Sequence, residues 1–233
     1  MIPAPIHLAG ERLLLDPEGA VLWPAQNLLV VADLHFEKGS SAARQGSLLP
    51  PWDTHATLDR LAGLLRRHRP ATVVALGDSF HDASASTRLT RSDAERLHGL
   101  CAVHHFVWVL GNHDPHPPTG FCGEAHDEFS LGPLNFRHQA RGRPPKVGAE
   151  LCGHHHPKAQ VAARGTNVTR PCFVADAHRL MLPALGTYTG GLDVRSPAIG
   201  TLFPRGGRAF LLGRDRLFSF TLGQLSEAPH TAV

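Results

Sequence analysis

The chain has 233 residues, of which 42% are hydrophobic, and a formal net charge of +3. That much apolar material is enough for one α/β domain with a sizeable core, and the small charge does not by itself indicate a nucleic-acid partner. No apolar run reaches the ~20 residues of a membrane helix, so we expect no membrane contact. We expect a single domain over residues 1–233, with a frayed tail over about 224–233.

The predicted strands are short apolar or alternating runs bounded by turn residues. In chain order they cover residues 11–15, 20–23, 28–32, 71–76, 106–110, 128–131, 134–138, 147–152, 173–174, 179–182, 199–203, 209–212 and 217–221. Leucines at helical spacing predict a helix from residue 54 to the residue before Pro70, capped by Asp53 or Thr54. Ser92 and Glu95 fit a capping box for a second helix that ends near Ala102.

The chain start and the cysteines bear on where the protein works. The first residues lack the basic and apolar regions of a secretory signal, which predicts a cytoplasmic protein. The four cysteines show no C-x-x-C spacing, so we expect reduced thiols and no zinc ribbon.

Seventeen histidines stand beside a single tyrosine. Because histidine is the commonest metal ligand, this excess is informative where the histidines cluster.

Four of the predicted strands run into residue types that bind metals. The residues that follow them are Asp33 and His35, Gly77 and Asp78, Asn112 to Asp114, and His154 to His156. In an open α/β sheet, sites form beyond the carboxyl ends of the strands, so these side chains can converge on one place. Any one of the motifs alone is more often an ordinary turn. Their combination in one chain indicates a metal site.

The chemistry of such a site favours two metal ions. Two cations about 3.5–4 Å apart repel each other, and a carboxylate that binds both offsets this repulsion; Asp78 is the expected bridge. A mixed nitrogen and oxygen ligand set suits Mn²⁺, with Fe or Zn²⁺ as alternatives, better than Mg²⁺ or Ca²⁺. A water between two such cations loses a proton near neutral pH and becomes a nucleophile. The other candidate ligands are Asp33, His35, Asn112, His138, His154 and His156.

Two further groups are candidates for roles beside the metals. His113 lies next to a proposed ligand and is expected to protonate the leaving oxygen, with Asp114 holding its other ring nitrogen. A basic stretch surrounds His138, and its side chains are expected to bind phosphates that flank the scissile one. A solvated loop is an equally good interpretation of that stretch. Its basic residues are Arg137, Arg141, Arg143 and Lys146.

In order and spacing, these motifs resemble the signature of the calcineurin-like metallophosphoesterases. The resemblance implies a four-layer αββα sandwich of two mixed β-sheets flanked by helices, with the metals at the sheet ends. It assigns one metal to Asp33, His35, Asp78 and His156, and the other to Asp78, Asn112, His138 and His154. His113 becomes the acid or a phosphate-positioning residue.

A narrower likeness covers residues 32–41, 48–54, 77–82 and 182–192. These segments resemble the bacterial ligase-associated DNA-damage-response phosphoesterases, the PdeM family. That resemblance implies a nucleic-acid substrate and a functional association with a DNA ligase, an exonuclease and a helicase.

The expected function is therefore a Mn²⁺-dependent phosphodiesterase or endonuclease that uses a metal-bridging hydroxide in DNA repair. An alternative is a phosphoesterase for a small nucleotide or a lipid-linked pyrophosphate. A third is a non-catalytic scaffold in a repair assembly that retains its metals for structure. The oligomeric state is not predicted.

Overall fold

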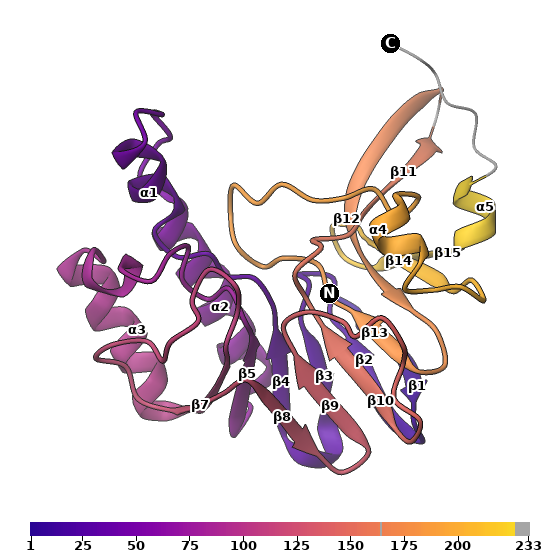
Figure 1. The fold of residues 1–233 in the computed structure, drawn as a ribbon, viewed down its shortest axis with the longest axis horizontal. Helices are drawn as coiled ribbons and strands as arrows, with labels where there is room; N and C mark the ends of the chain where they lie inside the picture. Colours follow the sequence, from indigo (N-terminus) through magenta and orange to yellow (C-terminus); the bar gives the residue numbers. More distant parts are fainter. Residues whose placement is uncertain (164, 227–233) are drawn as a thin grey trace.

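A computed structural model describes residues 1–163 and 165–226. Two mixed β-sheets stack face to face, and helices cover their outer faces (Figure 1). The order of the first sheet is β1-β2-β3-β4-β5-β6-β7, and that of the second is β15-β14-β12-β13-β10-β9-β8, with β11 paired to β12. The predicted α/β sandwich of two mixed sheets flanked by helices is confirmed.

The first sheet follows the chain in sequence. Its strands are β1 (Ala4–Leu8), β2 (Glu11–Leu15), β3 (Val21–Trp23), β4 (Leu28–Val31), β5 (Thr72–Leu76), β6 (His105–Val109) and β7 (Glu124–His126). Strands β1 to β4 pair antiparallel, whereas β4 to β7 pair parallel. The parallel half therefore presents the carboxyl ends of four neighbouring strands at one edge.

The second sheet is mixed in the same way. Its strands are β8 (Glu128–Leu131), β9 (Leu134–Arg137), β10 (Ala149–Cys152), β11 (Lys158–Ala163), β12 (Thr166–Ala175), β13 (Arg179–Met181), β14 (Arg208–Leu212) and β15 (Leu217–Thr221). Strands β9, β10 and β13 are parallel neighbours, and the remaining pairs are antiparallel. The long pair β11 and β12 projects from the body of the molecule (Figure 1).

Five α-helices are found in the described residues, together with 3₁₀ turns at Pro24–Gln26 and Ala85–Thr87. The helices are α1 (Lys38–Arg44), α2 (Asp53–His68), α3 (Arg91–Val103), α4 (Pro197–Gly200) and α5 (Leu222–Ser226). Helices α2 and α3 pack on the first sheet, and α4 and α5 pack on the second. The segment around α1 projects on the opposite side from β11 and β12 (Figure 1).

Three apolar clusters hold the four layers together. On β4, Leu28 and Val30 point between the sheets, while Leu29 and Val31 point toward α2 and α3. This alternation is the two-residue period of a strand, and every residue of β4 is buried because both of its faces are covered. On the outer side of the second sheet, Ile199 of α4 packs in the third cluster. Continuous apolar runs in the sequence thus become strands buried on both faces.

The predicted strand over residues 199–203 is wrong. Pro197 occupies the first turn of helix α4, a position that tolerates the missing N–H of proline. Ile199 and Phe203 are four residues apart and are both buried in the same cluster. Helix α4 ends at Gly200 and a turn leads on to Phe203, so residues 199–203 form no strand.

The helix starts also differ from the prediction. Thr90, rather than Ser92, caps α3: its side chain accepts the Asp93 N–H at 3.1 Å and donates to the Asp93 carboxylate at 2.8 Å. Helix α2 has no side-chain cap, because Asp53 instead accepts the Gly39 N–H at 3.0 Å and Thr54 accepts the Glu37 N–H at 2.8 Å. Both α2 residues therefore anchor the start of α1.

Several strands lack the apolar pattern that would have predicted them. The structure adds β1, β7 and β11, and it extends β12 over ten residues, of which only 173–174 were expected. At the carboxyl end, residues 224–226 are part of α5 and Leu225 is buried, which corrects the expectation of a frayed tail there. Residues 227–233 of the expected tail lie outside the described residues.

The four cysteines are free thiols, as expected. Cys152 and Cys172 are buried on the second sheet, and burial raises the pKa of both thiols. Among residues 1–163 and 165–226, the structure contains no helix with the length and apolar character required to cross a lipid bilayer.

Candidate metal centre

The predicted ligands lie just beyond the carboxyl ends of strands from both sheets. Asp33 follows β4, Asp78 follows β5, and His138 follows β9. The first two loops are joined by backbone hydrogen bonds, in which the Asp33 N–H donates to the Gly77 carbonyl at 3.3 Å and the His35 N–H donates to the Asp78 carbonyl at 2.8 Å. The β10 loop joins them where the His154 N–H donates to the two Asp33 carboxylate oxygens at 3.1 and 3.0 Å.

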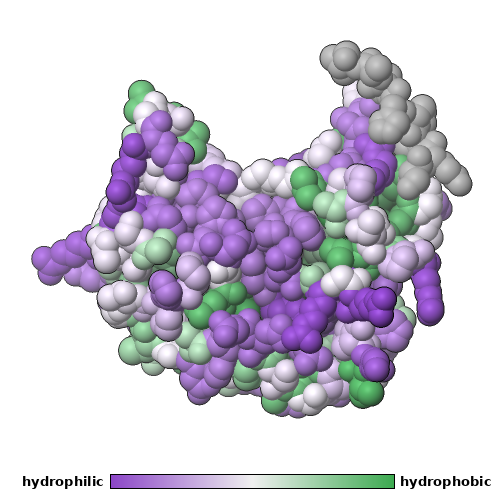
Figure 2. Space-filling model, in the orientation of Figure 1, coloured by the Kyte–Doolittle hydropathy of each residue, from purple (hydrophilic) through white to green (hydrophobic). Residues whose placement is uncertain are grey.

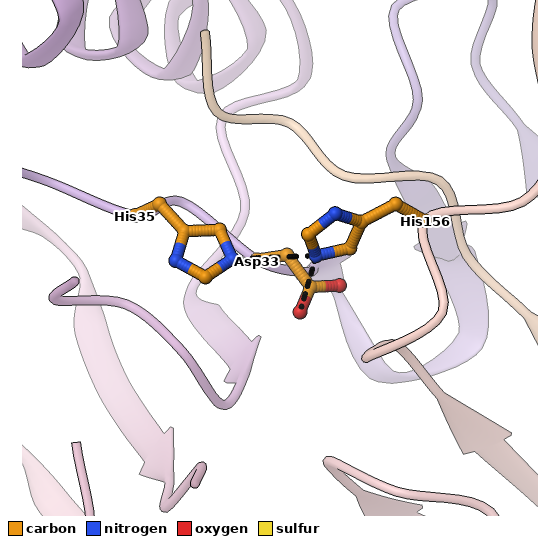
Figure 3. Close-up of side chains that lie close together, drawn as sticks. All are labelled: Asp33, His35 and His156. Carbon is orange, nitrogen blue, oxygen red and sulfur yellow. Dashed lines mark hydrogen bonds and ion pairs between the residues drawn. The ribbon is translucent and has the colours of Figure 1, made fainter. Parts of the chain in front are cut away.

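One group of potential ligands consists of Asp33, His35 and His156, whose donor atoms all lie within 4.8 Å of one another. His156 Nε2 is 3.3 Å from His35 Nε2 and 3.3 Å from Asp33 Oδ1. Figure 3 shows these side chains converging, although residue 156 is more than 120 positions from the other two in the chain. Asp33 is fully buried and His35 almost so.

A second group consists of Asp78, His138 and His154. His138 Nε2 lies 3.4 Å from Asp78 Oδ2 and 3.0 Å from His154 Nδ1. The predicted ligand Asn112 joins this group, because its Oδ1 is 2.9 Å from His138 Nε2. The other ring nitrogen of His138 donates to the Leu76 carbonyl at 2.9 Å, which leaves the lone pair of Nε2 directed into the group.

Asp78 lies between the two groups. Its Oδ2 is 3.4 Å from His138 Nε2 and 3.8 Å from His35 Nε2, while its Oδ1 accepts the His113 N–H at 2.9 Å. A single carboxylate thus faces both sets of imidazoles. This is the position that the sequence predicts for a bridging ligand.

The donor atoms are spaced as ligands of a metal ion. Nitrogen and oxygen ligands lie about 2.0–2.2 Å from Zn²⁺, and two of them on one ion are therefore about 3.0–3.5 Å apart. The nitrogen and oxygen atoms of each group show separations of this size. The two groups therefore fit two divalent cations.

The backbone at the site is strained. Asp33, His35, Asp78, His154 and His156 all have positive φ values, between 46° and 69°. The left-handed region is uncommon for residues other than glycine and costs on the order of 1–3 kcal/mol when the structure imposes it. Clustered outliers of this kind are typical of functional sites, because the surrounding fold holds the side chains in a fixed direction.

The charges of the side chains follow from burial and from their partners. Burial acts to raise the pKa of Asp78, but the hydrogen bond and charge of His138 and the N–H of His113 outweigh it and leave this pKa lowered. Burial lowers the pKa of His35, which keeps that ring neutral. At His138 the opposing effect of burial is overcome by Asp78 and Asp33, and the pKa rises to about 9. A cation would have to displace that proton.

His113 faces Asp78 but is not held by Asp114. Its Nε2 is 4.0 Å from Asp78 Oδ2, and its Nδ1 donates to the backbone carbonyl of His81 at 2.8 Å. The expectation that Asp114 holds the His113 ring is wrong. Although His113 and Asp114 are adjacent in the chain, the loop backbone directs their side chains apart.

Asp114 instead fixes the loop after β5. Its carboxylate accepts four backbone N–H groups, from Asp78 at 2.9 Å, Ser79 at 2.7 Å, Phe80 at 3.1 Å and Gly111 at 3.0 Å. Burial raises the pKa of Asp114 to about 6, although these hydrogen bonds oppose the shift. Gly111 is required here, because a Cβ at this position would overlap Asp78 Oδ1 and the Asp78 amide nitrogen.

His81 was not among the candidate ligands or acids, although its sequence position made it a candidate for the mouth of the site. Its ring stacks on His113, and its Nδ1 lies 3.2 Å from His35 Nδ1. A His35 that offers the Nε2 lone pair to a cation carries its proton on Nδ1 and can donate it to His81. The only signal in the sequence was its place three residues after Asp78, which a packing role explains equally well.

The four basic residues around His138 lie at the end of β9 and in the loop before β10, and none belongs to either ligand group. Arg137 is 5% exposed and forms ion pairs with Glu128 at 3.2 Å and with Glu150 at 3.3 Å. Arg141 pairs with Glu128 at 3.0 Å. With Arg143 and Lys146 they line a cavity of about 420 Å³. Their predicted contact with substrate stays a prediction.

The face of the molecule seen in Figure 2 is hollowed between two projections. Hydrophilic side chains gather between the α1 projection and the β11 and β12 projection (Figure 2). Such a surface leaves room for a charged substrate and offers no large apolar patch in this view for a lipid tail.

Comparison with known proteins gives the class of this protein. The family model of the calcineurin-like phosphoesterases matches residues 27–168. The chain therefore belongs to the calcineurin-like phosphoesterase family, whose members are metal-dependent hydrolases, and the resemblance inferred from the sequence is confirmed.

Among solved structures, the nuclease MPE of Pseudomonas putida is 32% identical, with a TM-score of 0.73, and the match covers 93% of this chain and all 100% of that one. The phosphoesterase Yfce of E. coli is 14% identical with a TM-score of 0.43, covering 84% of this chain and 98% of that one. A Vps29 single mutant of Entamoeba histolytica is 18% identical with a TM-score of 0.33, covering 84% and 92%. The comparison with curated proteins gave no match.

Proposed function

We propose that this protein is a binuclear, Mn²⁺-dependent phosphodiesterase that cuts nucleic acid and acts in DNA repair. The observation that carries the proposal is the carboxylate of Asp78, which faces the imidazoles of both ligand groups at 3.4 and 3.8 Å. The similarity to a nuclease over 93% of the chain supports the choice of a nucleic-acid substrate.

The chain's own residues suggest a division of labour. One cation would be held by Asp33, His35, His156 and Asp78, and the other by Asp78, Asn112, His138 and His154. When bound, divalent cations supply Lewis-acid stabilisation of a phosphoryl oxygen and lower the pKa of coordinated water. The mixed nitrogen and oxygen donors favour Mn²⁺, with Fe and Zn²⁺ as the alternatives.

His113 is the proposed acid. The His81 carbonyl accepts a hydrogen bond from the His113 Nδ1–H. This bond fixes the tautomer of His113, whose Nε2 faces Asp78 at the edge of the site. In this orientation a proton on Nε2 can pass to the oxygen that leaves phosphorus. The same atom can hold a phosphoryl oxygen in place by a hydrogen bond.

The test combines metal analysis with a substrate panel. Purified protein should contain two equivalents of metal per chain after reconstitution with Mn²⁺, and it should hydrolyse a DNA oligonucleotide and a small chromogenic phosphodiester. Asp78→Asn should abolish both activities, since it weakens both metal positions at once. The exposed Asp127→Asn provides the matched control with the same change of charge.

The outcomes separate the competing functions. Activity confined to small nucleotides or lipid-linked pyrophosphates would replace the nucleic-acid proposal by the small-substrate alternative. Tightly bound metal without turnover of any substrate would favour a metal-bearing scaffold. Cytoplasmic location and association with a DNA ligase, an exonuclease or a helicase are part of the same proposal and require pull-down and localisation experiments in the native host.

A further inference from the structure

We propose that the cavity beneath residues 137–146 is a second phosphate-binding site, separate from the metal centre. The cavity measures about 420 Å³ and is lined by the four basic side chains of this stretch, by Glu150 and by two prolines. A volume of this size accommodates a phosphate group and part of the ester that carries it. Arg137 and Glu150 lie on the outward side of β9 and β10, since Phe136 and Leu151 beside them point between the sheets.

The first observation is a buried guanidinium with unused donors. Arg137 is 5% exposed, yet its Nε and Nη1 have no hydrogen-bond partner. Its ion pairs join Nη2 to Glu128 at 3.2 Å and Nε to Glu150 Oε2 at 3.3 Å, and that Glu150 oxygen also lacks a hydrogen bond. A buried donor without an acceptor is costly, and native proteins rarely leave one so. Arg137 lines the cavity, so an anion that draws the guanidinium toward it would supply the missing acceptor.

The second observation is the balance of charge. Five cations line or adjoin the cavity, namely Arg137, Arg141, Arg143, Lys146 and Arg179, against the two carboxylates Glu128 and Glu150, which leaves an excess of three positive charges. Glu150 does not repel an anion strongly, because Arg179 and Arg137 both pair with it. The excess charge favours an anion with more than one negative charge.

The donor types select phosphate. Arginine presents several N–H donors in a fixed plane that matches a phosphate group, and lysine adds a mobile point charge. The cavity contains three arginines and one lysine. Two sources have this chemistry: a free phosphate ester or inorganic phosphate, and a backbone phosphate of the nucleic acid. The second source rests on the proposed function.

The test measures phosphate binding separately from catalysis. Inorganic phosphate is titrated calorimetrically into the full-length chain in Mn²⁺ buffer, using the Asp78→Asn protein so that binding at the metal centre does not contribute. One phosphate should bind, and adding Arg143→Gln with Lys146→Gln should weaken its Kd at least tenfold, about 1.4 kcal/mol. Adding Arg66→Gln with Arg91→Gln, which removes two charges from the helices of the other sheet, should leave the Kd unchanged.

A second measurement guards against a folding defect in Asp78→Asn. In the otherwise wild-type chain, phosphate should raise the melting temperature less in the Arg143→Gln and Lys146→Gln protein than in the Arg66→Gln and Arg91→Gln control. Equal phosphate responses in the two proteins, together with equal calorimetric affinities, would overturn the site.

A DNA arm identifies the source of the phosphate. If a backbone phosphate of nucleic acid occupies the site, the slope of log K against log salt should fall by about 1.4–1.8 in the Arg143→Gln and Lys146→Gln protein. If only inorganic phosphate responds, the ligand is a small phosphate compound. Hydrolysis of the small phosphodiester by the wild-type protein reports the metal centre independently, so its absence would refute the proposed function and leave the phosphate titration to decide this site.

Discussion

The ring of His81 stacks on the ring of His113, with centroids 4.8 Å apart and planes inclined by 21°. The backbone carbonyl of His81 also accepts a hydrogen bond from the His113 Nδ1–H. The Nδ1 atom of His81 lies 3.2 Å from the Nδ1 atom of His35. One residue thus orients both a candidate ligand and the candidate acid.

Replacing His81 should therefore reduce activity without unfolding the protein. His81→Ala removes the stacking and the contact with His35 but keeps the backbone carbonyl. Partners that orient ligand histidines are worth about 10–100-fold in activity or metal affinity, and we expect a loss of this size in kcat. His81→Phe keeps an aromatic ring against His113 and should lose less in kcat than His81→Ala while losing as much Mn²⁺ affinity. Wild-type kinetics and metal content in both variants would contradict the assigned role.

His113→Ala tests the acid. We expect turnover of the phosphodiester to fall by about 10²–10⁴-fold, the usual contribution of general acid catalysis, while the metal content stays at its wild-type value. The exposed His116→Ala in the same loop is the matched control and should retain full activity. Loss of metal from His113→Ala, measured by elemental analysis, would show that this ring is a ligand.

Asp114→Asn tests the support of the loop after β5. An asparagine amide has one acceptor oxygen, so two of the four N–H donors would face an NH₂ group, and each buried donor left without an acceptor costs about 1–3 kcal/mol. We expect a decrease of roughly 2–5 kcal/mol in the free energy of unfolding, measured by urea denaturation. Asp127→Asn on the surface should change it by no more than about 0.5 kcal/mol. A stability of Asp114→Asn equal to that of Asp127→Asn would mean that these hydrogen bonds are replaced at no cost.

Metal should stabilise the fold. The carboxylates of Asp33 and Asp78 are both buried within the candidate metal centre. A cation that binds only the folded chain adds about 2.7 kcal/mol to the free energy of unfolding at a hundredfold excess over its Kd. For a chain of this size, Mn²⁺ should then raise the melting temperature by about 5–10 °C, and a chelator should reverse the rise. Mg²⁺ should act more weakly because the imidazole donors do not suit it. An Asp78→Asn protein that shows the full shift would contradict the assignment of the bridge.

Strand topology predicted that the candidate ligands gather at one edge of the sheets, and the family resemblance divided them into two groups. Apolar runs such as the one at β4 could only be buried strands, and parallel strands bring the residues that follow them to one edge. The placing of His35 with His156 came from the family resemblance and not from topology, and their Nε2 atoms lie 3.3 Å apart.

The directions of individual side chains do not follow from strand topology. Asp114 was expected to hold His113, yet the backbone turns its carboxylate toward the Asp78 loop. Polar strands were missed for a related reason: β11 and β12 gain their stability from pairing with each other, and their outer residues bury little apolar surface that would leave a pattern. At Ile199 and Phe203 two apolar residues suited either period, and only Pro197 distinguishes a helix.

The positive φ angles at Asp33, His35, Asp78, His154 and His156 imply that thermal stability and metal binding place opposing demands on the backbone. Glycine at His154 or His156 would relieve the left-handed backbone strain there, and such a variant should melt at a higher temperature in chelator than the native sequence does. At Asp33 or Asp78, glycine would also remove the acceptor of the His154 or His113 N–H. Each of these substitutions would delete a ligand. Selection for a higher melting temperature without an activity screen would therefore favour variants that lack a ligand of the candidate metal centre.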